Sequence, residues 1–317
     1  MPQVTIVVVP RDRFSVAKRS LESIYRGTTG PFELVYVDGN SPSRVRRYLE
    51  REAIHRGFRL IRSDEFLSPN RARNLGLREV RTEYVAFVDN DVEVAPGWLG
   101  QLMTCAEETG AWAVGPLIFQ GSLQDEIVHI CGGVAELKDE GGIRSFREEH
   151  LFNGQTLAEV KPEIRRAETD FAEFHCVLFR REVFDRLGAC DEGLLSQEEH
   201  LDLALLIRQA GGTVYVEPDA RVAFPYDALL DDDDLEYARL RWSDDWNRRS
   251  TRHFADKWGL DPEGSWATGS IAWGNRHLDH LERLRRRPGS VMKGIVKGVA
   301  KTILPRHTYK ALQALRD

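Results

Sequence analysis

Residues 4 to 92 alternate between short apolar runs and longer segments with helical spacing, and this alternation limits the possible folds more than any other feature of the chain. Near-continuous apolar strands separated by helices are typical of a parallel sheet covered on both faces. We therefore predict an α/β fold of Rossmann-like type, with a mostly parallel sheet flanked by helices. The expected strands are residues 4–9, 32–37, 58–61 and 84–88, and the expected helices are residues 15–25, 43–55 and 70–79.

The segment Asp89-Asn90-Asp91 follows the apolar strand 84–88 and carries two carboxylates two residues apart. Ligands of parallel sheets bind beyond the carboxyl ends of the strands, so these side chains stand where a ligand is expected. A diphosphate with its metal ion needs hard oxygen ligands on a rigid support. The pair therefore predicts a divalent metal site, although such pairs also simply end strands and begin turns.

Two upstream segments supply candidates for binding a nucleotide. Residues 70–76, Asn-Arg-Ala-Arg-Asn-Leu-Gly, begin a predicted helix, where backbone N–H groups and a cation can meet phosphate oxygens. Asp38 follows the second expected strand and can accept hydrogen bonds from a nucleobase or ribose. The ordinary alternatives are surface arginines with an Asn cap in the first segment and a turn in the second.

Residues 92–226 have a less regular pattern, which indicates a loop-bearing half attached to the sheet. Within this half, residues 138–163 are charged and are expected to be flexible. Further on, polar residues precede a segment whose apolar members recur at helical spacing. These residues form a predicted cluster at a helix N-terminus, for which the alternative is a set of surface residues that complement the helix dipole: Glu198, Glu199, His200 and Asp202.

The C-terminal third is predicted to be helical. Residues 229–258 form one expected helix, and the acidic run 231–234 at its start suits the helix dipole, with a metal site as the minor alternative. Residues 291–304 form an expected amphipathic helix with Lys293, Lys297 and Lys301 on one face. This basic helix either packs on the domain or docks on an anionic membrane surface through residues 285–304.

Composition excludes several classes of protein. A formal net charge of −6 and a pI near 5.9 argue against nucleic-acid binding by the chain as a whole. The four cysteines show no CxxC spacing, so neither a zinc ribbon nor a disulfide framework is expected, and reduced thiols suit the cytoplasm. The apolar run 4–9 is too short to span a bilayer and lacks the basic lead of a signal peptide, so we expect a cytoplasmic protein.

Five motifs in this order resemble the family 2 inverting glycosyltransferases of the GT-A fold, over residues 3–225. They are Val-Asp38-Gly-Asn-Ser, Ala72-Arg73-Asn74-x-Gly76, Asp89-x-Asp91, Phe-Arg-Arg-Glu-Val-Phe-x-x-Leu-Gly with Asp191-Glu192, and Glu199-His-Leu-Asp202-Leu. The resemblance implies a nucleotide-diphospho-sugar donor, usually a UDP-sugar, with Mn²⁺ or Mg²⁺ at the Asp-x-Asp motif. It also implies a GT-A domain over 1–226, with a nucleotide-binding half 1–92 and an acceptor half 93–226, followed by a helical region 227–317.

The resemblance assigns roles to particular residues. Metal binding falls to Asp89 and Asp91, and Glu199 is our first choice for the base that deprotonates the acceptor hydroxyl, with His200 second. Donor-binding candidates are Pro10, Asp38, Asn70, Arg73, Asn74, Asp89 and Asn90. Acceptor-binding candidates are Trp98, His175, Glu198 and Asp202, although core packing is the ordinary interpretation of Trp98.

The chain departs from the family pattern at two places. Family members commonly have Glu-Asp-x-Asp where this chain has Glu199-His200-Leu201-Asp202, so the usual catalytic aspartate is a histidine. Many relatives also have a metal-binding histidine where this chain has Phe224 and Pro225. A ligand is therefore missing, or is supplied by His200 or water.

Two other functions compete with sugar transfer. A sugar-1-phosphate nucleotidyltransferase would have a glycine-rich loop after its first strand, and residues 9–14 contain no glycine. A relative that binds sugar nucleotides or membranes without catalysis is the second alternative, because of His200. By resemblance, a catalytic chain would serve surface polysaccharide or glycolipid assembly, with a saccharide or lipid-linked saccharide acceptor at the inner membrane face.

Overall fold

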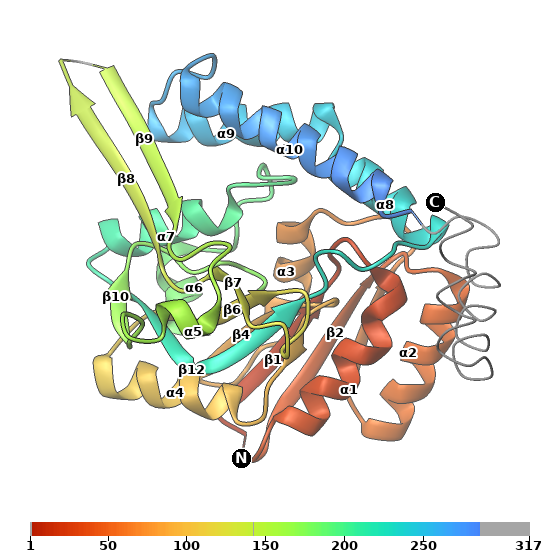
Figure 1. Ribbon diagram of the computed structural model, residues 1–317. Helices are drawn as coiled ribbons and strands as arrows, with labels where there is room; N and C mark the ends of the chain where they lie inside the picture. The colour runs from red at the N-terminus through yellow and green to blue at the C-terminus, as the bar shows by residue number, and fades with distance from the viewer. Residues whose placement is uncertain (1, 142, 286–317) are drawn as a thin grey trace, which may run out of the picture.

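The computed structural model describes residues 2–141 and 143–285 (Figure 1). Its N-terminal part alternates strands and helices as predicted. The elements are β1 (Val4–Val9), the 3₁₀ turn η1 (Phe14–Val16), α1 (Ala17–Gly27), β2 (Glu33–Gly39), α2 (Ser43–Arg56), β3 (Arg59–Ser63), α3 (Pro69–Leu77) and β4 (Tyr84–Asp89). The four strands are parallel and lie in the order β4-β1-β2-β3, which confirms the expected α/β arrangement.

The second half extends the same sheet. Its strands are β5 (Glu93–Val94), β6 (Ala113–Gln120), β7 (Ile127–Ile130), β10 (Ala167–Thr169), β11 (Cys176–Arg180) and β12 (Val214–Phe224). Its helices are α4 (Trp98–Thr109), α5 (Leu157–Val160), α6 (Glu182–Leu187) and α7 (Glu199–Gln209). The full order is β10-β12-β6-β11-β4-β1-β2-β3, with β5 on β12 and β7 on β6.

Strand β11 joins the two halves and determines where the site forms. It pairs antiparallel with β4, and Cys176 lies opposite Val88. Residues just before β11 therefore lie beside residues just after β4, and the backbone N–H of Asp89 donates to the carbonyl of His175 at 3.0 Å. A sheet of parallel strands alone would not bring these two segments together.

Residues 138–163, which the sequence predicts as a charged and flexible stretch, contain regular secondary structure. The structure forms a two-stranded hairpin there, from β8 (Gly133–Glu140) and β9 (Ile143–His150), followed by α5. The buried ring of Phe146 packs against Phe254 and Trp266, and Thr156 and Glu159 form a capping box at the start of α5. Many exposed charges along the hairpin concealed this apolar contact, and those of Ala135 and Leu137 with the core, in the sequence.

Three helices follow the sheet, namely α8 (Asp232–Arg241), α9 (Asp244–Trp258) and α10 (Ser265–Arg283). The expected single helix 229–258 is thus two helices, because Ser243 caps a new one by accepting from the N–H of Trp246 at 3.2 Å. Trp242 is buried at the break, and its Nε1 donates to Oδ1 of Asp12 at 2.8 Å. The three helices therefore lie over the carboxyl ends of the strands (Figure 1).

The acidic run 231–234 begins α8, as predicted. Asp231 and Asp234 form a capping box, but Asp234 is fully buried rather than solvated, because it accepts hydrogen bonds from the backbone and hydroxyl of Ser15. Within residues 2–141 and 143–285, no helix has the length and apolar character that crossing a membrane requires. The basic helix expected at 291–304 lies outside the described residues.

Candidate functional site

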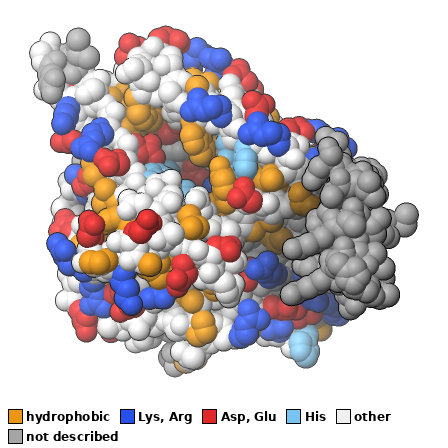
Figure 2. Space-filling model, in the orientation of Figure 1, with side chains coloured by type: hydrophobic (Ala, Val, Ile, Leu, Met, Phe, Trp, Pro, Cys, Tyr) orange, Lys and Arg blue, Asp and Glu red, His pale blue; other side chains and the backbone are white. Residues whose placement is uncertain are grey.

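The site lies where the ends of β1 and β4 meet α3, α7, α8 and the segment before β11. Figure 2 shows a hollow below the C-terminal helices, with acidic and histidine side chains visible inside it. Glycine at position 76 allows α3 to approach the sheet, because a Cβ there would stand 2.2 Å from Cγ1 of Val7. This close approach brings Arg73 of α3 to the end of β4.

Asp89 is a fully buried carboxylate between two arginines. Its Oδ2 accepts a hydrogen bond from Nη1 of Arg11 at 3.0 Å, and its Oδ1 lies 3.5 Å from Nη2 of Arg73. Burial raises the pKa of Asp89 above its ordinary value, although both arginines act in the opposite direction. Asn90 holds the loop after β1 in place, since its Oδ1 accepts from the N–H of Arg11 at 2.8 Å.

Asp91 is the most conspicuous acceptor in the site. Both of its carboxylate oxygens are buried and accept no hydrogen bond from the described residues, and the same is true of Oδ1 of Asp89. Burial raises the pKa of Asp91 to about 7. Buried carboxylate oxygens that accept no hydrogen bond are unfavourable unless a cation binds them, so the two oxygens of Asp91, with Asp89 beside them, fit a hard divalent ion such as Mn²⁺ or Mg²⁺.

Arg73 links the aspartates to α7. It is fully buried, its guanidinium lies 3.8 Å from the centre of the Phe174 ring, and its Nη1 donates to Oδ1 of Asn70 at 3.1 Å and to Oε1 of Glu199 at 3.4 Å. Arg241 of α8 approaches the same Oε1 to 3.6 Å. Burial alone would raise the pKa of Glu199, but the two arginines hold it below its ordinary value, so Glu199 is anionic.

His200 faces away from this arginine cluster. Its ring packs on Phe171 with 5.2 Å between centroids, and its Nε2 lies 3.9 Å from Oε1 of Glu148 on the hairpin. The two candidates for the base, adjacent in sequence, therefore occupy different surroundings. Glu199 belongs to the cluster around Asp89, and His200 belongs to a group of histidines beside the hairpin.

Glu198 and Asp202, two of the acceptor-binding candidates, are not brought together with the aspartates of the site. Oε1 of Glu198 accepts from the hydroxyls of Thr251 and Ser270 at 2.9 and 2.6 Å. Asp202 accepts from Nζ of Lys257 at 2.8 Å and from Nε1 of Trp258 at 2.9 Å. Both side chains attach α7 to the C-terminal helices.

The expected place of Trp98 at the acceptor site needs correction. The residue is completely buried at the start of α4, and its Nε1 donates to Oγ1 of Thr28 at 3.0 Å. A ring with no exposed surface cannot stack on a sugar, so Trp98 is a core residue. His175 is different, because its Nδ1 lies 3.7 Å from Oδ2 of Asp89.

The remaining donor candidates lie along the strand ends. Asp38 accepts from the N–H and the hydroxyl of Ser41, both at 2.9 Å, and from Arg62, so it both makes a turn and pairs with a cation. Pro10 is buried after β1, and a Cβ on Gly39 at the end of β2 would stand 3.1 Å from its Cγ.

Asn70 and Asn74 attach α3 to the segment before α7. Nδ2 of Asn70 donates to the carbonyl of Asp191 at 2.8 Å, and Asn74 exchanges hydrogen bonds with the backbone of Cys190 at 2.8 and 2.9 Å. Both side chains position the helix that carries Arg73.

The sequence did not identify several residues of the site. Arg241 and Asp12 lie 3.9 Å apart, and they come from α8 and from the loop after β1. The other group surrounds Glu173 and contains histidines from β7, β9 and the segment before β11. Only the concentration of His129, His150, His175 and His200 within 72 positions signals this group in the sequence.

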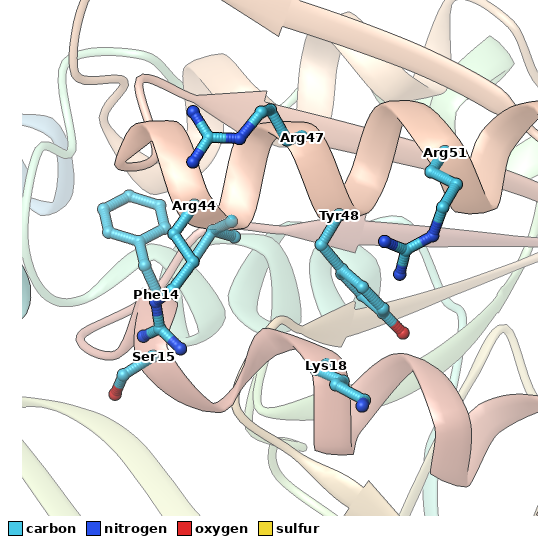
Figure 3. Close-up of a pocket in the computed structure, with 8 residues that line it drawn as sticks. Phe14, Ser15, Lys18, Arg44, Arg47, Tyr48 and Arg51 are labelled. Atoms are coloured by element: carbon cyan, nitrogen blue, oxygen red, sulfur yellow. The ribbon is translucent and has the colours of Figure 1, made fainter.

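A separate cavity of about 280 Å³ lies between α1 and α2 (Figure 3). Four cations, Lys18, Arg44, Arg47 and Arg51, line it together with Phe14, Ser15, Val45 and Tyr48. The carboxylates around Asp89 are not among its lining residues. This cavity is therefore distinct from the cluster at the ends of β1 and β4.

The continuous sheet, with β11 antiparallel beside β4 and with helices around it, defines a GT-A fold. The chain belongs to glycosyltransferase family 2, because the family model "Glycosyl transferase family 2" matches residues 5–188. A solved structure with the same fold is that of GalNAc-T7 with UDP, GalNAc and Mn²⁺. It has a TM-score of 0.55 and 16% identity, and the match covers 87% of this chain and 54% of that one.

Two curated relatives are named for related roles. The pre-mycofactocin glycosyltransferase of Mycobacterium tuberculosis is 26% identical over 231 residues, which are 72% of this chain and 44% of the relative. The O-antigen biosynthesis protein RfbC of Myxococcus xanthus is 27% identical over 233 residues, which are 70% of this chain and 17% of the relative. The chain thus spans less than half the length of either relative.

Phe224 occupies the position where many family members have a metal-binding histidine. A histidine lies beside it nonetheless, because the His175 ring is stacked on Phe224 with 4.2 Å between centroids. The His129 ring meets Phe224 edge-on at 4.9 Å. An imidazole is therefore present near Asp89, although it comes from the segment before β11 rather than from the end of β12.

Proposed function

We propose that this chain transfers a sugar from a nucleotide-diphospho-sugar to an acceptor hydroxyl with inversion at the anomeric carbon. The supporting observation is the buried, unpartnered carboxylate of Asp91 beside Asp89 at the carboxyl end of β4. Membership of glycosyltransferase family 2 supports the reaction class. A UDP-sugar is the proposed donor, in keeping with the UDP and Mn²⁺ bound in the GalNAc-T7 crystal structure.

The residues of the site divide the work of binding the donor. Asp89 and Asp91 would hold the metal ion, which would supply positive charge to the leaving diphosphate. Pro10, Asp38 and Asn90 lie at the carboxyl ends of β1, β2 and β4, respectively, and contact the nucleotide.

Arg73 lies buried between Asp89 and Glu199, where its guanidinium faces the proposed phosphate position. Asn70 and Asn74 hold α3, and with it Arg73, against the segment before α7.

Glu199 is the proposed base. Its lowered pKa keeps it ionised at neutral pH, and its position near Arg73 connects it to the donor side of the site. As the acceptor oxygen attacks the anomeric carbon, Glu199 takes the hydroxyl proton. His200 is the second candidate, because it follows Glu199 directly and lies beside His150 and Glu148 of the hairpin.

The function is tested by donor cleavage with a variant that keeps the shape of the metal site. Asp91→Asn removes one anionic ligand, so we expect release of UDP from UDP-sugars to fall by about 100-fold or more. Chelation by EDTA should abolish release by the wild type, and Mn²⁺ should restore it. Asp256→Asn, at an exposed position on α9, is the matched control.

Two outcomes would contradict the proposal. Donor binding without turnover under any metal condition would indicate a binding module rather than an enzyme. Formation of a UDP-sugar from a sugar 1-phosphate and UTP would indicate a nucleotidyltransferase. A thermal-shift screen of nucleotide sugars with Mn²⁺ would identify the donor, because a ligand of the folded state raises its stability.

We place the acceptor among saccharides or lipid-linked saccharides of surface polysaccharide or glycolipid assembly, in keeping with the O-antigen role in the name of RfbC. Peripheral membrane contact through residues 285–304, at the inner face of the membrane, is part of this proposal. Removing residues 288–317 should lower co-sedimentation with anionic liposomes several-fold and leave binding to neutral liposomes unchanged. Equal co-sedimentation of both forms would refute the membrane contact.

A further inference from the structure

A second group of potential metal ligands lies next to the aspartates of the donor site. Glu173 is in the segment before β11, and three histidine Nε2 atoms surround its carboxylate. His175 and His129 lie 3.1 and 3.2 Å from Oε2, and His150 lies 3.5 Å from Oε1. These residues come from β7, from the end of β9 and from the segment before β11, so the fold assembles the group from distant parts of the chain.

The spacing of the donor atoms fits a metal ion. In a tetrahedral site with bonds of about 2.0–2.1 Å, neighbouring ligand atoms stand about 3.3 Å apart. His129, Glu173 and His175 each offer one ligand atom, and these atoms lie within 4.8 Å of one another. Two imidazole nitrogens with one carboxylate oxygen favour a zinc-like transition metal over Mg²⁺ or Ca²⁺, which prefer oxygen ligands.

Hydrogen bonding alone leaves His175 poorly satisfied. This ring is 2% exposed, and both of its nitrogens face carboxylates, Nε2 toward Glu173 and Nδ1 toward Asp89 at 3.7 Å. A neutral imidazole has one N–H and one lone pair, so one of its nitrogens must direct a lone pair at a carboxylate. A metal ion at Nε2 removes this conflict and leaves the Nδ1 proton directed at Asp89, an arrangement common for ligating histidines.

We propose that His129, Glu173 and His175 bind one divalent transition-metal ion of the zinc type, at a site separate from the carboxylates of Asp89 and Asp91. Three protein ligands leave a coordination position for water or a substrate oxygen, as in catalytic zinc sites. His150 lies next to the proposed ligands, because its Nε2 is 3.5 Å from Oε1 of Glu173 and 3.2 Å from Oε1 of Glu148. The His175 ring connects the two metal sites through Asp89.

The test measures metal on the protein and does not depend on the proposed sugar transfer. The purified full chain is stripped with a chelator, dialysed with Zn²⁺ or Co²⁺, and analysed for metal content by mass spectrometry and for the visible absorption of bound Co²⁺. We expect one tightly bound Zn²⁺ ion per chain. The visible spectrum of the Co²⁺ form should be that of a four- or five-coordinate ion. His129→Gln and His175→Gln should each weaken binding by at least about 100-fold.

Two controls separate this site from its surroundings. Asp91→Asn alters the donor site and should keep the Zn²⁺ equivalent and the Co²⁺ spectrum, while His55→Gln removes an exposed histidine on α2 and should also keep both. His129 is partly exposed, so His129→Gln is expected to fold even if His175→Gln does not, and circular dichroism of the metal-free proteins checks this.

The proposal is overturned if the wild type holds no Zn²⁺ or Co²⁺ after dialysis. It is also overturned if His129→Gln binds like the wild type, or if Asp91→Asn loses the same single ion, which would make the histidines part of the donor metal site. If Asp91→Asn no longer releases UDP but still holds Zn²⁺, both the proposed sugar transfer and the histidine metal site are supported. If the wild type holds Zn²⁺ but cleaves no nucleotide sugar, the metal site alone is supported.

Discussion

Glu198 and Glu199 are adjacent and both buried at the start of α7, yet their surroundings are opposite. Glu199 lies 3.4 Å from Arg73 and 3.6 Å from Arg241, and these arginines lower its pKa despite burial. Glu198 accepts hydrogen bonds from hydroxyl groups of α9 and α10, and burial raises its pKa to about 7. The lowered pKa favours the ionised form of Glu199, whereas the raised pKa of Glu198 favours its protonated form up to about neutral pH.

The difference shows that burial does not identify the functional side of α7. Arg73 of α3 and Arg241 of α8 converge on the side of α7 that faces Asp89. On the other side, α7 is attached to the C-terminal helices by hydroxyl donors to Glu198 and by Lys257 and Trp258, which donate to Asp202. Glu198 has a φ of 64°, which is uncommon for a residue other than glycine, and this turn directs consecutive side chains to opposite sides. The convergence of Arg73 and Arg241 on Glu199, and not burial, therefore distinguishes the site from the packing contact.

The largest expected effect comes from removing an arginine from the charged side. Arg73→Met leaves Glu199 and Asp89 buried without their shared cation, and breaking a buried pair in this way costs about 3–5 kcal/mol. We expect this loss in the free energy of unfolding, measured by denaturant titration of the metal-free chain. Arg71→Met is the matched control, because Arg71 is an exposed residue of the same helix that pairs with Glu65, and its loss should cost about 1 kcal/mol or less.

Equal destabilisation by the Arg71 and Arg73 variants would mean that the buried arginine is not the partner that stabilises these anions. A smaller loss in Arg73→Met at low pH, where the carboxylates are protonated, would support the charge argument.

The next prediction concerns activity and compares three neighbouring variants. Glu199→Gln cannot accept the acceptor proton, so turnover should fall by about 100-fold or more, while the Km for the donor changes little. Glu198→Gln keeps its hydrogen bonds to α9 and α10, and its turnover should stay within about threefold of the wild type. Initial rates of sugar transfer provide the measurement.

His200→Ala distinguishes the two candidates for the base. A modest decrease is expected, because its ring faces the hairpin and not the arginine cluster. Near-normal turnover in Glu199→Gln together with a large loss in His200→Ala would assign the proton transfer to His200 instead.

The elements that position the site could be predicted because their signals are local. Apolar runs at β1, β2 and β4 and the helical spacing of α3 gave the parallel sheet, and the rule that ligands bind at the carboxyl ends of strands pointed to Asp89 and Asp91. The order of short motifs then indicated the family. None of these steps requires knowledge of which distant segments meet.

The rest of the site could not be predicted because it depends on contacts between distant segments. Arg241 is 168 positions after Arg73, and both reach Glu199 only because α8 lies over the sheet. His129 and His150 meet Glu173 because the hairpin and β7 fold back beside β11. The hairpin itself was missed because charged residues cover its exposed face and one buried ring, Phe146, anchors it.

The smallest expected effect is a change in how stability depends on pH, and it tests the side of α7 that packs on α9 and α10. The pKa of Glu198 is about 7 in the folded chain and 4.5 ordinarily, so the folded state binds a proton more tightly than the unfolded state. Its contribution to stability is complete below pH 4.5 and is lost as the pH rises through about 7, by on the order of 2 kcal/mol. Glu198→Gln should therefore flatten this part of the stability profile, measured by denaturant titration from about pH 5 to about pH 8.

Glu236→Gln, at an exposed position of α8, should leave the slope unchanged. Asp91, whose pKa is also raised to about 7, contributes a slope of its own to both the wild type and Glu198→Gln. A slope in Glu198→Gln as steep as that of the wild type would therefore show that Glu198 does not take up a proton in this pH range.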